Sequence, residues 1–167
     1  METIANDFTI NIATANGTGS QSANLILLQS MFEMGIPVSG KNMFPSNISG
    51  LPTWYIVRLS DHGYQAPGDR THIQVLVNPA TWDEDLAALE PGSVVIWNSD
   101  AKREMNRDDV ISYPVPMSSL ARKINPKIAK LVTNIVYVGI LAEMLGINQA
   151  ALVSALTKQF KGKEKAI

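Results

Sequence analysis

The sequence predicts an α/β fold: a Rossmann-like, three-layer sandwich with a mostly parallel central sheet flanked by helices. Two observations predict it. Short runs of apolar and β-branched residues alternate with longer segments of helical periodicity, and this order favours parallel strands joined by helices. Of the 167 residues, 46% are hydrophobic and 17% are charged, which is enough apolar material for the core of one domain.

Strands are expected where short apolar or alternating runs lie between turn residues. In chain order these runs are residues 8–13, 36–39, 54–59, 72–77, 93–98 and 111–115. The run SVVIWN at 93–98 predicts a buried strand most clearly, because its four central residues are all apolar sheet formers.

Helices are expected where apolar residues recur three and four positions apart and capping or stop signals flank them. These segments are residues 20–34, a stretch from Pro79 or Thr81 to the Pro91-Gly92 turn, and residues 117–123, 126–145 and 148–160.

Some polar residues inside these helices need an explanation. We interpret Asp83, Glu84 and Asp85 as a solvated helix start, where acidic side chains are favourable. Asn134 and Tyr137 lie in an otherwise apolar helix, so we interpret them as hydrogen-bonded core residues.

Composition excludes several function classes. The net charge is −1, from 14 basic and 15 acidic residues, and predicts no nucleic-acid partner. There are no cysteines, so this chain holds no disulfide, thiolate zinc site or cysteine-ligated iron–sulfur cluster. The N-terminus has no signal-peptide pattern, and the longest apolar run, 131–145, is too short and polar to span a membrane. We therefore expect a cytoplasmic protein without membrane partners.

One domain is expected over residues 1–160. Residues 161–167 are polar and rich in lysine, and we interpret them as the start of a linker to a following domain.

A glycine-containing turn between the first strand and the first helix is a candidate ligand site. Gly17 and Gly19 would let the backbone approach an anion at the helix N-terminus. The third glycine of a dinucleotide fingerprint is absent, and no acidic residue follows about 20 positions later. Two alternatives stay open: a tight turn capped by Ser20 and water, or a contact with another phosphate-bearing ligand or a neighbouring domain.

Other candidates for chemistry are weaker. His62 and His72 have no acidic or thiol companion at ligand spacing, so we interpret them as surface or strand residues. Ser20, Ser46 and Ser99 lack the context of an activated nucleophile. The sequence predicts no catalytic residue and no metal ligand in this chain.

Five stretches, in order along most of the chain, resemble one protein family. They are ANGTGSQSAN (15–24), GIPVSGKNMFPSNISGLPTWYIVRLS (35–60), LVNPATW (76–82), LEPGSVVIWNSD (89–100) and NIVYVGILAEMLGI (134–147). They resemble the gamma domain of the 2-oxoacid:ferredoxin (acceptor) oxidoreductases, most closely the N-terminal part of the alpha subunit of the 2-oxoglutarate type.

The resemblance is residue-specific in the glycine loop. Most of the family reads glycine-x-glycine-glycine-glutamine-glycine there; Gly17, Gly19 and Gln21 match, whereas Ser20 and Ser22 replace glycines. The resemblance implies a cofactor-binding role for Gly17, Gly19, Ser20 and Gln21.

The resemblance also implies an activity. Such enzymes oxidatively decarboxylate a 2-oxoacid to acyl-coenzyme A and CO₂ and pass the electrons to ferredoxin. The 2-oxoacid is expected here to be 2-oxoglutarate. The reverse reaction belongs to the reductive TCA cycle. The complete enzyme is expected to use thiamine diphosphate, Mg²⁺, 4Fe-4S clusters and coenzyme A. Its expected partners are a following thiamine-binding domain, a beta subunit and ferredoxin. This chain alone is expected to be inactive.

The segment from Lys41 to Pro52 is the second candidate site. Pro45, Gly50 and Pro52 restrict its backbone to a defined non-helical path. With the family in view, we expect a shaped loop that meets a partner domain near the active centre. The site residues expected there, including one in the strand that follows, are Lys41, Asn42, Pro45, Ser46, Asn47, Gly50 and Arg58.

Each of these residues has an expected role. Lys41 is expected to pair with a substrate or coenzyme anion, and the polar side chains to donate hydrogen bonds. Trp54 and Tyr55 would anchor the loop, and Arg58 would face an acidic partner or a carbonyl end. The alternatives are a purely structural loop in an assembly domain and a stand-alone nucleotide- or coenzyme A-binding module without catalysis.

Overall fold

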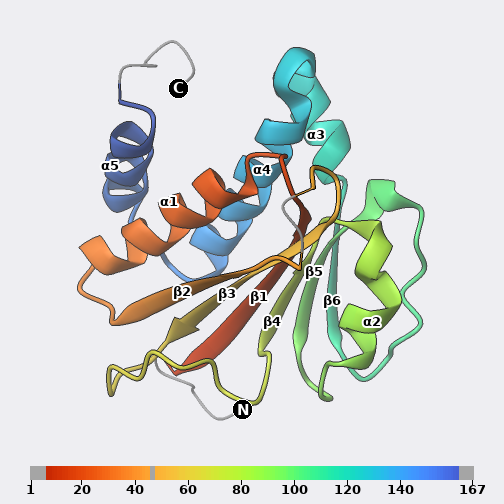
Figure 1. Ribbon diagram of the computed structural model, residues 1–167, viewed down its shortest axis with the longest axis horizontal. Helices are drawn as coiled ribbons and strands as arrows, with labels where there is room; N and C mark the ends of the chain where they lie inside the picture. The colour runs from red at the N-terminus through yellow and green to blue at the C-terminus, as the bar shows by residue number, and fades with distance from the viewer. Residues whose placement is uncertain (1–6, 46–47, 162–167) are drawn as a thin grey trace.

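The computed structural model describes residues 7–45 and 48–161 and confirms the α/β class (Figure 1). Its sheet has six strands in the order β2-β3-β1-β4-β5-β6. The strands are β1 (Phe8–Ala15), β2 (Val38–Met43), β3 (Pro52–Leu59), β4 (Ile73–Leu76), β5 (Val94–Asn98) and β6 (Ile111–Val115). The helices are α1 (Ser20–Glu33), α2 (Trp82–Ala87), α3 (Met117–Ile124), α4 (Ala129–Met144) and α5 (Gln149–Gln159), with short 3-10 turns at Pro79–Thr81 (η1), Ser99–Ala101 (η2) and Pro126–Ile128 (η3).

The sheet is mostly parallel, as expected. β1, β4, β5 and β6 pair in parallel, and β3 runs antiparallel to both of its neighbours, β1 and β2. β3 is therefore the one reversed strand of this sheet in the described part of the chain. A hairpin joins it to β2.

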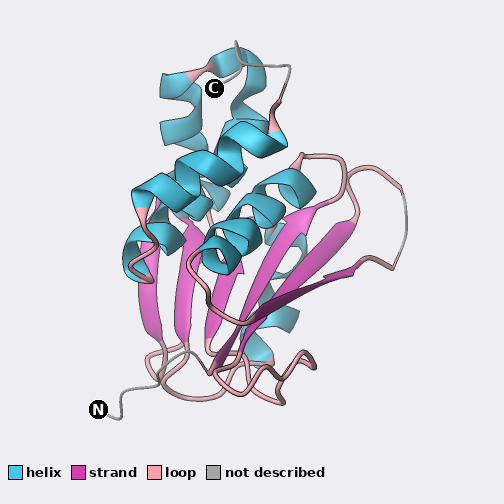
Figure 2. Cartoon of the chain, turned by 90° about the vertical axis from the view of Figure 1, so that its left-hand side faces the viewer, coloured by secondary structure: helices cyan, strands magenta, loops and turns pink. Residues whose placement is uncertain are grey.

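The two faces of the sheet carry separate apolar cores, because successive strand residues point to opposite faces. On one face Ile10, Ile12 and Val75 pack under α1, α4 and α5. On the other face Ala13 and Leu76 pack under the short helix α2. Figure 2 shows the larger helical layer in front of the sheet and α2 behind it, so the three layers are unequal.

The connections leave a crevice at the carboxyl ends of β1 and β4. The chain passes from β1 into α1 on one face, and from β4 into α2 on the other (Figure 1). In open α/β sheets, such a change of face beside neighbouring parallel strands is where ligands bind.

The second predicted strand was too short. We expected residues 36–39, whereas β2 runs from Val38 to Met43 and includes Lys41 and Asn42, which we had placed in a loop. Gly40, Lys41 and Asn42 have weak strand preference. Pairing with β3, in the register Lys41 to Ile56 and Asn42 to Tyr55, overrides it.

Among the described residues, no helix combines the length and the apolar character that a membrane crossing requires.

Candidate functional site

The loop between β1 and α1 adopts the strained geometry that its glycines allow. Gly17 has φ of 80° and Gly19 has φ of 84°, both in the left-handed region. A Cβ atom at Gly17 would lie 2.6 Å from Ser49 Oγ, and one at Gly19 would lie 2.7 Å from Leu131 Cδ1. Both positions therefore require glycine for conformation and for space.

Helix α4 holds this loop from behind. Asn134, which is 1% exposed, donates from Nδ2 to Thr18 O at 2.9 Å. Thr18 Oγ1 in turn donates to Ala15 O at 2.8 Å. One turn further along α4, the fully buried Tyr137 hydroxyl donates to Asn24 Oδ1 of α1 at 2.8 Å. Asn134 and Tyr137 are thus hydrogen-bonded core residues, as the sequence predicted.

The hairpin between β2 and β3 lies directly against the glycine loop. Asn16 N donates to Leu51 O at 2.8 Å, and Gly50 N donates to Asn16 O at 2.9 Å. The fold therefore brings together the two segments that the sequence marked as candidate sites, although the bonded residues Asn16 and Gly50 are 34 positions apart in the chain.

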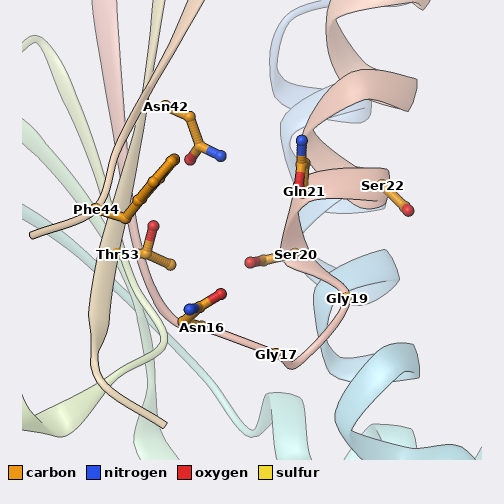
Figure 3. A pocket seen from close by; sticks show the side chains of 9 residues that line it. All are labelled: Asn16, Gly17, Gly19, Ser20, Gln21, Ser22, Asn42, Phe44 and Thr53. Atoms are coloured by element: carbon orange, nitrogen blue, oxygen red, sulfur yellow. The ribbon is translucent and has the colours of Figure 1, made fainter. Parts of the chain in front are cut away.

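Between these segments is a hollow of about 330 Å³, the loop hollow (Figure 3). Ser20 points from α1 toward the strands, whereas Ser22 points away. Asn42 and Phe44 face α1 from the hairpin side. The lining residues are Asn16, Gly17, Gly19, Ser20, Gln21, Ser22, Asn42, Phe44 and Thr53.

The electrostatics of the loop hollow favour an anion. No side chain caps the N-terminus of α1, and its first turn has no acidic residue. The first backbone N–H groups of a helix lack intrahelical partners and carry partial positive charge. Ser20 does not cap α1, and among the described residues no carboxylate lines the hollow.

A second hollow, the strand-end hollow, lies on the other side of the glycine loop and has a volume of about 290 Å³. Two asparagines line it: Asn98 is the last residue of β5, and Asn78 lies two residues beyond the end of β4. Asn78 Nδ2 donates to Thr14 O at 3.2 Å, and Asn98 Nδ2 donates to Ser118 Oγ at 2.9 Å. Sequence reasoning missed both residues; their signal was an amide at or just beyond the carboxyl end of each of two buried parallel strands.

The predicted residues of the hairpin segment do not all lie at one site. Asn42 lines the loop hollow, and Gly50 lines the strand-end hollow. Lys41 is exposed and, by strand alternation, lies on the opposite face of the sheet from Asn42. Pro45 is exposed and lines neither hollow. Ser46 and Asn47 lie outside the described residues, as do residues 162–167 of the expected linker.

Arg58 lies at the far end of the sheet from both hollows. It pairs in register with Thr9, near the start of β1. Its guanidinium forms an ion pair with Asp7 and donates to Leu59 O at 2.7 Å. The structure therefore does not bring Arg58 together with the other predicted residues.

Trp54 and Tyr55 do hold the base of the hairpin in place. Trp54 Nε1 donates to Asp85 Oδ1 at 2.8 Å, and Thr81 Oγ1 donates to Asp85 Oδ2 at 2.6 Å. Tyr55 is buried on the opposite face, under α1.

Asp85 is not part of a solvated helix start. Its side chain is buried, because the short helix α2 turns it toward Trp54 and the sheet. Burial raises the pKa of Asp85, although the hydrogen bonds from Thr81 and Trp54 act in the opposite direction. The prediction failed because it treated the acidic run as one unit, whereas Asp85 lies three residues after Trp82 and shares the buried face of α2 with Trp82 and Leu86.

The two histidines are a strand-end residue and a surface residue, as the sequence predicted. His72 accepts a hydrogen bond from Thr9 N at Nδ1 over 3.1 Å, and burial lowers its pKa. His62 is exposed beside Asp61. Neither lines the loop hollow or the strand-end hollow.

Comparisons with known proteins give a consistent picture. The family model described as pyruvate ferredoxin/flavodoxin oxidoreductase matches residues 9–167. No curated protein sequence matches the chain significantly.

Three solved structures share the fold. 2-Oxoglutarate:ferredoxin oxidoreductase from Magnetococcus marinus, solved with 2-oxoglutarate, coenzyme A and succinyl-CoA bound, has a TM-score of 0.79 and 23% identity over 95% of this chain and 28% of that one. The gamma subunit of keto/oxoacid ferredoxin oxidoreductase from Geobacter sulfurreducens has a TM-score of 0.73 and 18% identity over 90% of this chain and 85% of that one. The pyruvate oxidoreductase subunit PORC from Thermotoga maritima has a TM-score of 0.73 and 17% identity over 93% and 86%. This chain thus spans about a quarter of the first relative and most of the other two.

Proposed function

Because the chain belongs to the pyruvate ferredoxin/flavodoxin oxidoreductase family, we propose that it is the gamma-type domain of a thiamine-diphosphate-dependent 2-oxoacid:ferredoxin oxidoreductase. The complete enzyme would oxidise a 2-oxoacid, in our proposal 2-oxoglutarate, and form the acyl-coenzyme A and CO₂. This domain would contribute to assembly and to the coenzyme A side of the active site. The joined glycine and hairpin loops, with a hollow on either side, are the observation that carries the proposal.

Coenzyme A fits the chemistry of this end of the sheet. Its phosphates are anionic, and the loop hollow combines an uncapped helix N-terminus, two left-handed glycines and no carboxylate among its described lining residues. Asn42, Thr53 and Gln21 offer hydrogen bonds, and Phe44 offers an apolar surface. The backbone of Gly17, Gly19 and Ser20 would lie nearest to the ligand.

The other cofactors would be held by the rest of the enzyme. When bound, thiamine diphosphate with Mg²⁺ supplies the electron sink for decarboxylation, and iron–sulfur clusters carry electrons to ferredoxin. This chain has no cysteine to hold a cluster. The domain would then bind and orient the acyl acceptor. A rigid scaffold that carries two shaped loops is suited to that role.

The position of the Lys41 side chain favours a role in assembly. Its side chain is exposed on the face of the sheet that α2 covers, away from the loop hollow. We therefore assign Lys41 to the contact with a following thiamine-binding domain or a beta subunit, and Asn42 to the coenzyme.

The neighbouring residues Asn42 and Lys41 allow a matched test in the assembled enzyme, with the 2-oxoacid-dependent reduction of ferredoxin as the assay. Asn42→Ala is expected to raise KM for coenzyme A about 2- to 10-fold, the usual net contribution of one hydrogen bond, and to leave KM for the 2-oxoacid unchanged. Lys41→Ala is expected to leave KM for coenzyme A unchanged and to weaken association with the partner. An unchanged KM for coenzyme A in Asn42→Ala would contradict the assignment of this hollow.

A further inference from the structure

Positive charge is concentrated where α3 passes into α4. Within nine residues the chain carries Arg122, Lys123, Lys127 and Lys130, and no acidic residue. All four side chains are exposed. This junction lies at the same end of the sheet as the glycine loop (Figure 1).

Three of these cations surround a hollow of about 520 Å³, the basic hollow. Arg122, Lys127 and Lys130 line it from α3, η3 and α4. Gly17 and Thr18 of the glycine loop form its opposite wall. Lys130 and the same loop residues also line the strand-end hollow, so these two hollows adjoin at the glycine loop, and Gly17 lines the loop hollow as well.

Helix geometry accounts for only some of this charge. Arg122 lies in the last turn of α3, where the helix dipole favours a cation. Lys127 and Lys130 lie at the start of the η3–α4 segment, where the same dipole opposes a cation. Their placement raises the free energy of the domain unless an anion binds there.

The basic hollow has no carboxylate among its described lining residues. In residues 7–45 and 48–161, none of the three cations forms an ion pair. Asp100 interacts electrostatically with Arg122, but its two oxygens accept hydrogen bonds from Ser119 N at 2.6 Å and Ser119 Oγ at 2.8 Å. The carboxylate of Asp100 is thus engaged by the start of α3, and the hollow is left positive.

We propose that the basic hollow binds a phosphomonoester dianion through Arg122, Lys127 and Lys130. A phosphomonoester carries nearly two charges and three free oxygens, so three cations can each contact one oxygen. A phosphodiester or one unit of a diphosphate has fewer free oxygens and less charge per phosphorus atom. The identity of the ligand rests on the proposed function: the phosphomonoester is the ribose phosphate of coenzyme A. The hollow then selects the phosphorylated coenzyme over its dephospho form.

Calorimetric titration tests the phosphomonoester site. The full chain is titrated with coenzyme A and with dephospho-coenzyme A at the same low ionic strength. Coenzyme A is expected to bind at least tenfold more tightly, which corresponds to about 1.4 kcal/mol. The double variant Lys127→Gln/Lys130→Gln is expected to remove most of that preference. Lys123→Gln is the control, because Lys123 belongs to the same segment but does not line the hollow.

The outcomes separate this inference from the proposed function. Equal affinity for the two coenzymes overturns the phosphomonoester site and leaves the coenzyme site standing. Absence of binding by either coenzyme, in the chain and in the assembled enzyme, overturns both. If the double variant keeps its preference for coenzyme A but loses binding to ferredoxin or another acidic protein, the cations form a protein-docking surface and the inference is wrong.

Discussion

Replacing Gly19 by alanine tests whether the glycine loop is shaped by its contact with α4. At φ of 84°, an alanine is disfavoured by about 1–2 kcal/mol relative to glycine. The added Cβ would also lie 2.7 Å from Leu131 Cδ1, so the leucine must move at a further cost of about 1 kcal/mol. We expect Gly19→Ala to lower the free energy of unfolding by about 2–3 kcal/mol in total.

The two contributions are separable. Gly35→Ala is the matched control: its φ is 77° and nothing lies within 4 Å of the added Cβ, so it carries the backbone cost alone. In urea denaturation at 25 °C, Gly19→Ala should therefore be about 1 kcal/mol more destabilising than Gly35→Ala. In a double-mutant cycle, Leu131→Ala should recover that difference. Equal costs for the two glycines, or no coupling to Leu131, would refute the contact between the loop and α4.

Three other predictions concern polar side chains. Tyr137→Phe should lower the free energy of unfolding by about 1–3 kcal/mol in urea, because it leaves Asn24 Oδ1 buried without its donor; a loss below 0.5 kcal/mol would contradict that role. Burial raises the pKa of Asp85 above its unfolded value, so its neutral form favours the folded state. Wild type should therefore gain stability relative to Asp85→Asn as pH falls from 7 toward 4, and a pH-independent difference would be inconsistent with the raised pKa. Arg107 donates to Leu86 O at 2.8 Å and to Leu89 O at 3.1 Å. Arg107→Ala should therefore destabilise the end of α2 by about 1–2 kcal/mol and speed amide hydrogen exchange there. Unchanged exchange would argue against a stabilising role of these two hydrogen bonds.

Local signals were enough to predict most of the elements. β6 spans the predicted residues, and α5 follows an Asn148 cap whose Oδ1 accepts from Ala150 N at 2.7 Å. Asn134 and Tyr137 were predicted as bonded core residues because an apolar helix cannot bury unpaired polar groups cheaply. The local sequence predicted that these two side chains are bonded, but their partners, Thr18 and Asn24, are more than 100 residues away.

Other features depend on partners that are distant in sequence. The extension of β2 through Lys41 and Asn42 comes from the β3 ladder, and Asp85 is buried because Trp54, 31 residues away, donates to it. The basic hollow joins Thr18 to a segment more than 100 residues later. Its sequence signal was a run of four cations without an acid, but its position beside the glycine loop depends on the packing of α4 against α1.

The central claim is that coenzyme A binds where the glycine and hairpin loops meet. The most direct measurement is amide chemical-shift mapping of the isotope-labelled chain during titration with coenzyme A. The account predicts that the largest shifts occur at Gly17, Gly19, Asn42 and Gly50, with smaller shifts at Lys127. Shifts confined to the α2 side of the sheet, or none at saturating ligand, would contradict it.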